Sequence, residues 1–405
     1  EASGTADAAT TATEAMTDIL VGNDFLPKTR KLYYLHQRPL TEGPMDADSL
    51  VHWFFEDQLK GIFFGFLKIV EKLLQDTVEY NRERATRFLF DMIMACPLEQ
   101  QANTLSLLAN KLGDPHKKLS SRIIFYLEEL VKAHPQQIQL AIIAAIKDVI
   151  TRPAVPERAQ YYGLTLFSQL YFSAKQPEVV TAVMSVYTIF FKSVVVPIIV
   201  ELNNKKKKNM RNRKKMDDDS FEPPRLAKAI LSGINRAMPF LPPSTTDTKR
   251  AVGDFFEPLL KLCKMSNVNT AILALSLFHQ LSKVTDNALQ RNILFNQLCD
   301  LVGEWMRLSK FSNSYGALFA LLDKIVDDDH KADGKLERLA KRVVNSAVQM
   351  DTNFACRALI WLNKAIRKQP RLRASISMPP EGVEDVRETC LFELISLSKH
   401  AHSMV

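Results

Sequence analysis

Apolar residues recur at helical spacing along most of the chain. In "HKKLSSRIIFYLEELVKAHP" apolar residues recur at i, i+4, i+7, i+8, i+11 and i+12, and the polar face carries Lys118, Arg122 and Glu129. This spacing places one apolar stripe on one face of a helix. The stripe comprises Leu119, Ile123, Tyr126, Leu127, Leu130 and Val131. Similar patterns run from about Asp48 onward without strand-like alternation, so the sequence predicts an all-α protein.

The spacing of the prolines predicts how the helices are arranged. Proline is tolerated at helix starts and disfavoured in helix interiors, so each interval between prolines holds about one helix and its turn. Pro97 and Pro135 are 38 residues apart, and Pro135 and Pro177 are 42 residues apart. Pro115 and Pro156 lie near the middle of these intervals. A helix-hairpin period near 40 residues is typical of HEAT and armadillo arrays, so we expect an α-solenoid of HEAT/armadillo-like helical repeats in two blocks.

Changes in composition divide the chain into four predicted parts. Residues 1–24 are rich in Ala and Thr and lack apolar periodicity, which predicts a disordered tail or a weak helix. Residues 25–202 form the N-terminal HEAT-like repeat block. Residues 203–224 hold basic residues, aspartates and "FEPP" and read as a linker without a core. Helical periodicity resumes at Arg225, and residues 225–405 form the C-terminal helical-repeat block.

The basic run in this linker carries the whole net charge of the chain. The formal net charge is +8, and the run contains eight basic residues and no acidic residue. These candidate RNA-binding residues are Lys205, Lys206, Lys207, Lys208, Arg211, Arg213, Lys214 and Lys215. The rest of the chain is neutral on average, so an acidic partner would be met there by local patches rather than by a global field. The run is compatible with a targeting signal, with a phosphate tether, and with both together.

The sequence holds little that predicts catalysis or metal binding. It lacks the Walker, GxGxxG, GxSxG and HExxH motifs, so we expect no enzyme, no cofactor and no metal site. The five cysteines form no CxxC pair, which argues against a zinc site or disulfide framework and for a reducing compartment. We interpret Asp217–Asp219 as solvated counter-charge and Asp327–Asp329 as a turn that compensates nearby basic residues. His400 and His402 are interpreted as helix-surface residues.

The longest apolar stretch, "VYTIFFKSVVVPIIVEL" (Val186–Leu202), is interrupted by Lys192 and Pro197. We expect it to be too short and too interrupted to span a bilayer. No secretory signal is recognisable. The chain begins at Glu1 without Met, and we expect it to be part of a longer protein.

A basic segment interleaved with aromatic residues lies near the N-terminus, in "PKTRKLYYLHQRPL" (Pro27–Leu40). Its candidate RNA-binding residues are Lys28, Arg30, Lys31, Tyr33, Tyr34 and Arg38. Cations neutralise phosphates, and aromatic faces stack on unpaired bases. In the alternative interpretation, Leu32, Tyr33 and Leu35 only pin this segment to the first repeat.

A second basic patch is predicted on the helix "RLAKAILSGINRAMPF", where Arg225, Lys228 and Arg236 lie opposite an apolar stripe. Packing explains the apolar half, and the basic face is a candidate contact surface. Gly233 lies inside the helical pattern, where glycine costs about 1 kcal/mol relative to alanine. That cost predicts the close approach of another helix or of a backbone.

A third basic patch, "NKAIRKQPRLR", lies at a helix end and the turn after it. Its candidate RNA-binding residues are Lys364, Arg367, Lys368, Arg371 and Arg373. Cations near a helix C-terminus also stabilise the helix dipole, so both interpretations stay open.

Seven stretches occur in an order that is more specific than any one of them. They are "LVHWFFEDQLK" (50–60), "LLANKLGDPHKK" (107–118), "ERAQYYGLTLFSQL" (157–170), "RLAKAILSGINRAMPF" (225–240), "NVNTAILALSLFHQL" (267–281), "FACRALIWLNKAIRKQPRLR" (354–373) and "ETCLFELISLSKHAHSMV" (388–405). Singly each is only a helix. As an ordered set they resemble the CCAAT-binding-factor family of nucleolar ribosome-assembly proteins.

The resemblance implies an α-solenoid in the nucleolus or nucleus that acts early in assembly of the large (60S) ribosomal subunit. Family members pair with a second nucleolar-complex HEAT protein and contact pre-rRNA, other assembly factors and ribosomal proteins. No catalysis is known for the family, and no membrane partner is expected. The chain departs from the family pattern in lacking long charged tails and in its short acidic linker, "SMPPEGVEDVRE".

The leading hypothesis is therefore a non-enzymatic scaffold in early 60S assembly. One alternative is a transcription factor of the CCAAT-binding type that reads duplex DNA. The sequence shows no helix-turn-helix, zinc-finger or basic-zipper element, which argues against that alternative. The other is a HEAT adaptor that binds proteins and has no RNA affinity.

Overall fold

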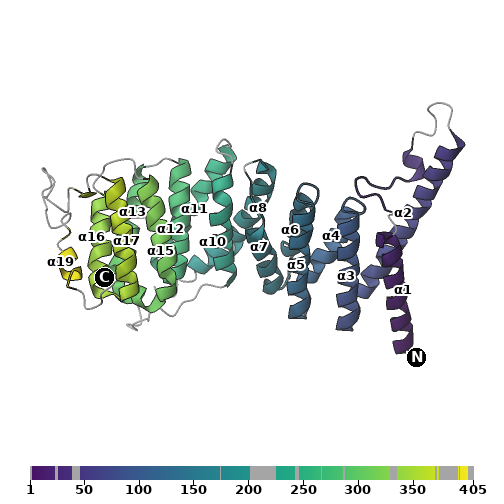
Figure 1. Ribbon diagram of the computed structural model, residues 1–405, viewed down its shortest axis with the longest axis horizontal. Helices are drawn as coiled ribbons and strands as arrows, with labels where there is room; N and C mark the ends of the chain where they lie inside the picture. The colour runs from purple at the N-terminus through teal and green to yellow at the C-terminus, as the bar shows by residue number, and fades with distance from the viewer. Residues whose placement is uncertain are drawn as a thin grey trace. The chain divides into compact units, whose positions relative to one another are not determined.

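The computed structural model describes residues 2–22, 26–38, 46–173, 175–200, 225–241, 246–265, 267–285, 288–328, 335–369, 372–373, 391 and 393–399. Within these ranges the chain forms helices and no strands (Figure 1), so the predicted all-α repeat fold is confirmed. Its contacts divide it into two units, Glu1–Val186 and Tyr187–Val405.

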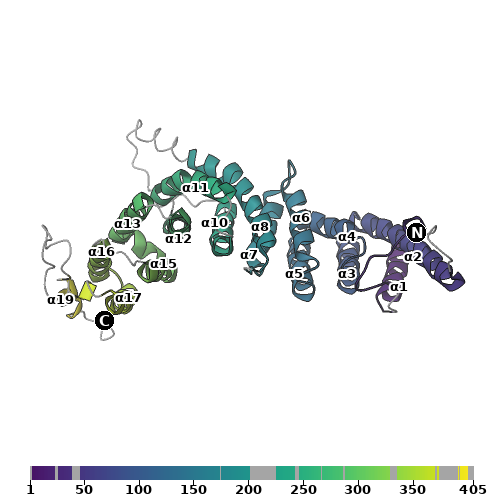
Figure 2. The same cartoon turned by 90° about the horizontal axis from the view of Figure 1, so that it is seen from above.

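The first unit stacks its helices in two layers. Its helices are α1 (Ala2–Gly22), α2 (Ala47–Leu74), α3 (Glu79–Ala95), α4 (Gln101–Asn110), α5 (Lys117–Ala133), α6 (Gln139–Ile150), α7 (Glu157–Gln169) and the start of α8 (Pro177–Phe190), with 3₁₀ turns at Leu35–Gln37 and Lys111–Gly113. Helix α5 contacts α3 and α7, while α4 contacts α6. Alternate helices therefore share a layer, as Figure 2 shows.

The second unit repeats this arrangement. It begins within α8, which runs into a π-helical turn at Phe191–Val195. Its further helices are α10 (Arg225–Ala237), α11 (Thr246–Met265), α12 (Val268–Thr285), α13 (Ala288–Gly303), α14 (Trp305–Leu308), α15 (Tyr315–Asp328), α16 (Lys335–Gln349), α17 (Thr352–Lys368) and α19 (Glu393–Leu397), with 3₁₀ turns at Met238–Phe240 and Ser309–Ser314. Helix α12 contacts α10 and α15, α15 contacts α17, and α13 contacts α16.

Hydrogen bonds between neighbouring hairpins confirm the repeat length expected from the prolines. In the first unit, His134 Nε2 lies 3.0 Å from the Met94 carbonyl oxygen, across a separation of 40 residues. In the second unit, the Ser346 hydroxyl donates to the Val302 carbonyl at 2.7 Å, across 44 residues. Equivalent positions of neighbouring repeats lie side by side, so these separations approximate the length of one repeat.

The predicted stripe of α5 forms part of the core. Leu119, Ile123, Leu127 and Leu130 are each at most 2% exposed. Tyr126 is only half-buried and stacks on Phe90 of α3, with 4.4 Å between ring centroids. Helical periodicity thus identified the buried face, because burial in a helix follows the 3.6-residue turn.

The N-terminal segment forms a helix, the second of the two states expected for residues 1–24, and not a disordered tail. Helix α1 packs against α3, and Thr13, Thr17 and Leu20 are buried at spacing i, i+4 and i+7. The Glu14 carboxylate also pairs with Arg84 of α3. Most helical stability in proteins comes from packing of such a face, and the composition of residues 1–24 does not reveal that contact.

The boundary between the units lies within α8, earlier than the boundary predicted after residue 202. Composition located the break at the polar residues, whereas contacts locate it inside a continuous helix. The predicted linker, residues 203–224, lies outside the described part of the chain. The basic and acidic residues there stay a sequence prediction.

One continuous helical run, Pro177–Val200, is 24 residues long and reaches a mean hydropathy of 2.1. It is long and apolar enough to cross a membrane, so the expectation that this stretch is too short was wrong. The helix begins before Val186 and continues across Lys192 and Pro197, the two expected interruptions. A core helix passes the same test, and Val180, Val183 and Val195 are fully buried here.

Candidate nucleic-acid interface

The N-terminal basic-aromatic segment is fastened to α2 by a buried carboxylate. Glu56, whose side chain is 10% exposed, pairs with both Arg30 and Arg38. Its Oε1 also accepts a hydrogen bond from the Tyr33 backbone N–H at 2.9 Å. Burial alone would raise the pKa of Glu56, but the hydrogen bonds from Arg30 and Tyr33 and the two arginine charges hold it below its usual value.

Two further carboxylates satisfy the backbone of the same segment. Glu99, which is 3% exposed, accepts a hydrogen bond from the Leu32 N–H at 2.6 Å. Asp57 accepts one from the Leu35 N–H at 2.9 Å. Lys60 donates to the Leu32 carbonyl and lies 3.8 Å from the Glu99 carboxylate. We call residues 30–38 with Glu56, Asp57, Lys60 and Glu99 the clasp.

The clasp supports the pinning interpretation of this segment. The Arg38 guanidinium lies 4.7 Å from the Tyr33 ring centroid and 5.4 Å from that of Trp53. The Lys60 ammonium lies 4.9 Å from the Tyr34 ring centroid. One face of each of these two rings, which were proposed to stack on bases, is thus taken by a cation of the protein itself, although Tyr33 stays 42% exposed. Lys28 and Lys31 are exposed and stay candidates for phosphate contact.

Helix α10 presents its basic residues away from its buried face, as predicted. Arg225 and Arg236 are exposed and Lys228 is half-buried. A Cβ atom at Gly233 would lie 2.1 Å from the Tyr187 ring, so the predicted close approach is confirmed, and the approaching element is α8. Tyr187 is fully buried, and this burial raises its pKa above the usual value, partly offset by the charge of Arg236.

The C-terminal basic patch is partly occupied by ion pairs between helices. The Lys364 ammonium on α17 lies 3.1 Å from the Asp323 carboxylate on α15, and Lys368 pairs with Asp327. The hydrogen bond from Lys368 holds the pKa of Asp327 below its usual range. Two interpretations of this patch came from the sequence, stabilisation of the helix dipole and RNA contact, and neither of them includes this pairing. Arg367 and Arg373 are exposed, and Arg371 lies outside the described residues.

A neighbouring pair extends these contacts to a third helix. Asp328 at the end of α15 pairs with Lys283 of α12, and His279 Nε2 lies 3.4 Å from the Asp328 carboxylate. Burial lowers the pKa of His279 to about 4, against the opposing charge of Asp328. Asp327 and Asp328 therefore compensate basic residues as predicted, from a helix end rather than a turn. We call the pairs joining α12, α15 and α17 the ladder.

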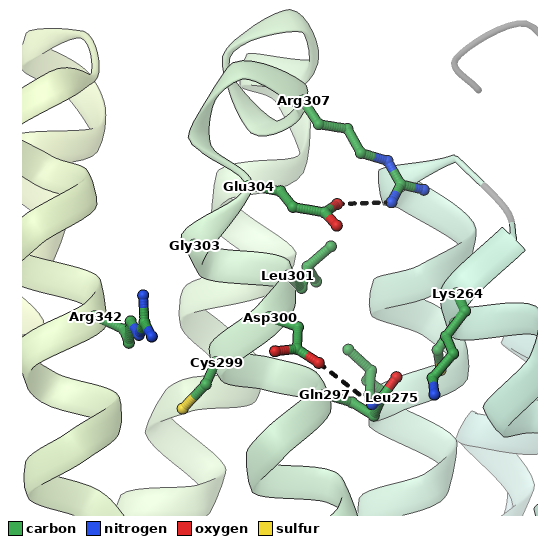
Figure 3. A pocket seen from close by; sticks show the side chains of 11 residues that line it. Lys264, Leu275, Gln297, Cys299, Asp300, Leu301, Gly303, Glu304, Arg307 and Arg342 are labelled. Atoms are coloured by element: carbon green, nitrogen blue, oxygen red, sulfur yellow. Dashed lines mark hydrogen bonds and ion pairs between the residues drawn. The ribbon is translucent and has the colours of Figure 1, made fainter. Parts of the chain in front are cut away.

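A cavity of about 390 Å³ lies in the second unit and has no counterpart in the sequence predictions. Figure 3 shows Arg342 of α16 facing α13, and Glu304 paired with Arg307 at 2.9 Å. Cys263 and Cys299 also line this cavity. Burial raises the pKa of Cys263 to about 12 and that of Cys299 to about 11, so both remain thiols at neutral pH and are poor nucleophiles.

Over the described residues, no group of three or more His, Cys, Asp or Glu side chains is arranged to hold a metal ion. The basic run Lys205–Lys215, Asp217–Asp219, Asp329, His400 and His402 lie outside those residues. Their predicted roles are unchanged by the structure.

Comparison with known proteins identifies relatives of the chain, although no family model matches it. Ribosome biogenesis protein NOC1 of Chaetomium thermophilum is 27% identical over 406 residues, covering 92% of this chain and 38% of that protein. Human CCAAT/enhancer-binding protein zeta is 27% identical over 377 residues, covering 90% and 32%. Nucleolar complex protein 1 of Drosophila melanogaster is 24% identical over 361 residues, covering 86% and 28%.

These three proteins are homologues of the chain. The resemblance found in the seven ordered stretches is therefore confirmed. The chain spans about a third of the length of these relatives. Solved structures add no further argument: an engineered protein aligns with a TM-score of 0.32 at 11% identity over 87% of this chain and 81% of its own. Cohesin subunit Scc3 of Z. rouxii aligns with a TM-score of 0.23 at 13% identity, over 87% of this chain and 50% of the Scc3 chain.

Proposed function

We propose that this protein is a non-enzymatic scaffold in early assembly of the large (60S) ribosomal subunit, in the nucleolus. In this proposal it binds pre-rRNA together with a second HEAT protein of the nucleolar complex and other assembly factors. The observation that carries the proposal is the alignment with ribosome biogenesis protein NOC1 over 92% of the chain. The helical repeat fold supports it, because stacked hairpins bury a continuous core and leave extended surfaces for partners.

The proposed mechanism is preferential binding of one rRNA conformation. A scaffold stabilises a folding intermediate by the difference between its affinities for that conformation and for the alternatives. Contacts to phosphates and to RNA shape suit exposed cations. Among the candidate residues, the exposed and described cations include Lys28, Lys31, Arg225, Arg236, Arg367 and Arg373. The run Lys205–Lys215 would add a sequence-independent tether.

Crosslinking in cells tests the proposal. Ultraviolet crosslinking of the tagged protein, followed by sequencing of the bound nucleic acid, should recover precursor rRNA of the large subunit. Recovery of promoter DNA without rRNA would favour the transcription-factor alternative, which the name of the zeta relatives suggests for those proteins. Recovery of proteins alone would favour the adaptor.

Binding in vitro assigns the basic run. Replacement of Lys205–Lys208 and Arg211–Lys215 by Ser and Gly should weaken RNA affinity and flatten its salt dependence, because fewer counterions are released. A variant that keeps its RNA affinity but loses binding to a partner protein would show that the run has been misassigned.

A further inference from the structure

One face of α2 is apolar and exposed. The helix buries Leu59, Phe63, Phe66, Leu67, Val70 and Leu74 in the core, and the clasp covers a second face at Glu56, Asp57 and Lys60. The third face carries Val51 (67% exposed), Phe55 (54%), Ile62 (52%) and Ile69 (50%), with Phe54 (57%) beside them. At about 100° per residue these five side chains fall within about 100° of the helix circumference. We call them the α2 stripe.

Two glycines on the same face are not explained by packing within the chain. A Cβ atom at Gly61 or Gly65 would meet nothing within 4 Å. At Gly163, by contrast, a Cβ would lie 2.9 Å from Ile146 and Ile150. Glycine destabilises a helix interior, and at Gly163 its use is explained by the clash that a larger side chain would make. Packing among the described residues gives no such explanation for Gly61 and Gly65, where another helix can approach closely.

The position and charges of α2 indicate what approaches it. Helix α2 lies at one edge of the described helices of the first unit (Figure 1). Asp46 and Asp48 are exposed at its N-terminal end, and Lys68 and Lys72 are exposed at its C-terminal end, where the exposed Glu71 lies on the side away from the stripe. A helix with the same charge order complements α2 when the two run antiparallel, which also opposes their dipoles favourably.

We propose that the α2 stripe is a self-association surface on which the α2 helix of a second copy docks antiparallel. A two-fold axis that crosses the stripe at the level of residue 60 pairs each residue with its mirror in sequence: Phe55 of one copy meets Gly65 of the other, and Val51 meets Ile69. The ring of Phe55 then fills the notch that the glycine leaves. The same register places Asp48 opposite Lys72 at both ends, as an isologous interface requires.

Analytical ultracentrifugation of the 405-residue chain tests this surface. The wild-type chain should show a concentration-dependent monomer–dimer equilibrium. Ile62→Asp and Gly65→Leu should each raise the dissociation constant at least tenfold and leave the fold intact by circular dichroism, because Ile62 is 52% exposed and a Cβ atom at Gly65 meets nothing within 4 Å. Ile360→Asp is the matched control, since Ile360 is 71% exposed on α17, and it should leave the equilibrium unchanged.

Charge reversal tests the antiparallel register. Asp48→Lys and Lys72→Asp should each weaken the dimer by placing like charges together, whereas the double variant should restore wild-type association. A wild-type chain that stays monomeric at about 100 μM, or a dimer that Ile62→Asp leaves intact, overturns the proposal. Failure of the double variant to restore association overturns the register. If the chain stays monomeric and floats with phosphatidylcholine vesicles in a stripe-dependent way, the α2 stripe binds lipid and not a second copy of the chain, which contradicts the proposal.

Discussion

The clasp and the ladder began as the same kind of sequence feature and have different roles in the structure. Each contains cations that were candidates for RNA contact, and in each some of those cations pair with carboxylates of another part of the chain. In the clasp the carboxylate of Glu56 is 10% exposed and takes a backbone N–H and two arginines, Arg30 at 50% and Arg38 at 20% exposure. In the ladder Asp327 and Lys368 are 46% and 45% exposed.

This difference in burial decides how much each feature matters for stability. Removal of one partner of a buried pair leaves an uncompensated charge or unpaired donors, which costs about 3–5 kcal/mol. An exposed pair contributes about 0–1 kcal/mol, because water and salt replace most of what is lost. The clasp is therefore expected to hold the N-terminal segment in place. The ladder is expected to add only a small stabilisation to helices that already pack through apolar residues.

The largest expected effect is that of Glu56→Gln. The variant removes the charge that Arg30 and Arg38 share, and it should lower the free energy of unfolding of the first unit by about 2 kcal/mol, because Arg30 is half exposed and is solvated in the variant. Hydrogen exchange should show loss of protection in residues 26–38 before the rest of the unit. Glu71→Gln is the matched control, an exposed glutamate on the same helix, with an expected effect within about 0.5 kcal/mol. Equal effects at the two positions would contradict a structural role for the clasp.

Acid should remove the contribution of the clasp. The folded pKa of Glu56 lies below its usual value of 4.5. A carboxyl group with a lowered folded pKa contributes stability that is fully present above its unfolded pKa and is lost as pH falls through its folded pKa. The difference in unfolding free energy between wild type and Glu56→Gln should be constant from about pH 7 to 5 and shrink below about 4.5. A difference that grows on acidification would contradict this sign.

The sequence predicted what depends on local spacing. The stripe of α5 and the repeat length follow from apolar periodicity and proline positions, and Gly233 revealed a close approach because glycine is costly inside a helix. The clasp depends on partners far away in sequence: Leu32 and Glu99 are 67 residues apart. Nothing in the pattern around Arg30 or Arg38 indicates that Glu56 neutralises both. A glutamate at a core-facing position of "LVHWFFEDQLK" was the one signal, since a buried carboxylate needs partners.

The candidate RNA surface was for the same reason only partly predictable. Composition identifies cations, whereas tertiary pairing decides which of their charges remain for phosphate. The burial of α1 was hidden in the same way, because its core-facing residues include threonines rather than a run of large apolar side chains. Exposure of the α2 stripe could not be read from a pattern that predicts only an apolar helix.

RNA affinity should separate the ladder lysines, Lys364 and Lys368, from Lys28 and Lys31 in the N-terminal segment. Lys28→Ala with Lys31→Ala should weaken binding of single-stranded RNA about tenfold at about 0.15 M salt and reduce the salt slope by about 1.4, as expected for two lost phosphate contacts. Lys364→Ala with Lys368→Ala is the matched double variant and should change affinity less, because carboxylates already neutralise both ammonium groups. Electrophoretic mobility shifts over a salt series measure both. The reverse ranking would make the ladder, not the N-terminal segment, the RNA contact.

The smallest expected effect is the coupling between Lys368 and Asp327. A double-mutant cycle with Lys368→Ala and Asp327→Ala should give a coupling energy of less than about 1 kcal/mol, because both side chains are nearly half exposed. About 0.5 M salt should reduce it further by screening. The parallel cycle with Arg38→Ala and Glu56→Ala should give a larger coupling that salt affects less, since Glu56 is buried. Equal couplings with equal salt dependence would mean that burial does not distinguish the two regions, and that the clasp is as dispensable for folding as an ordinary surface pair.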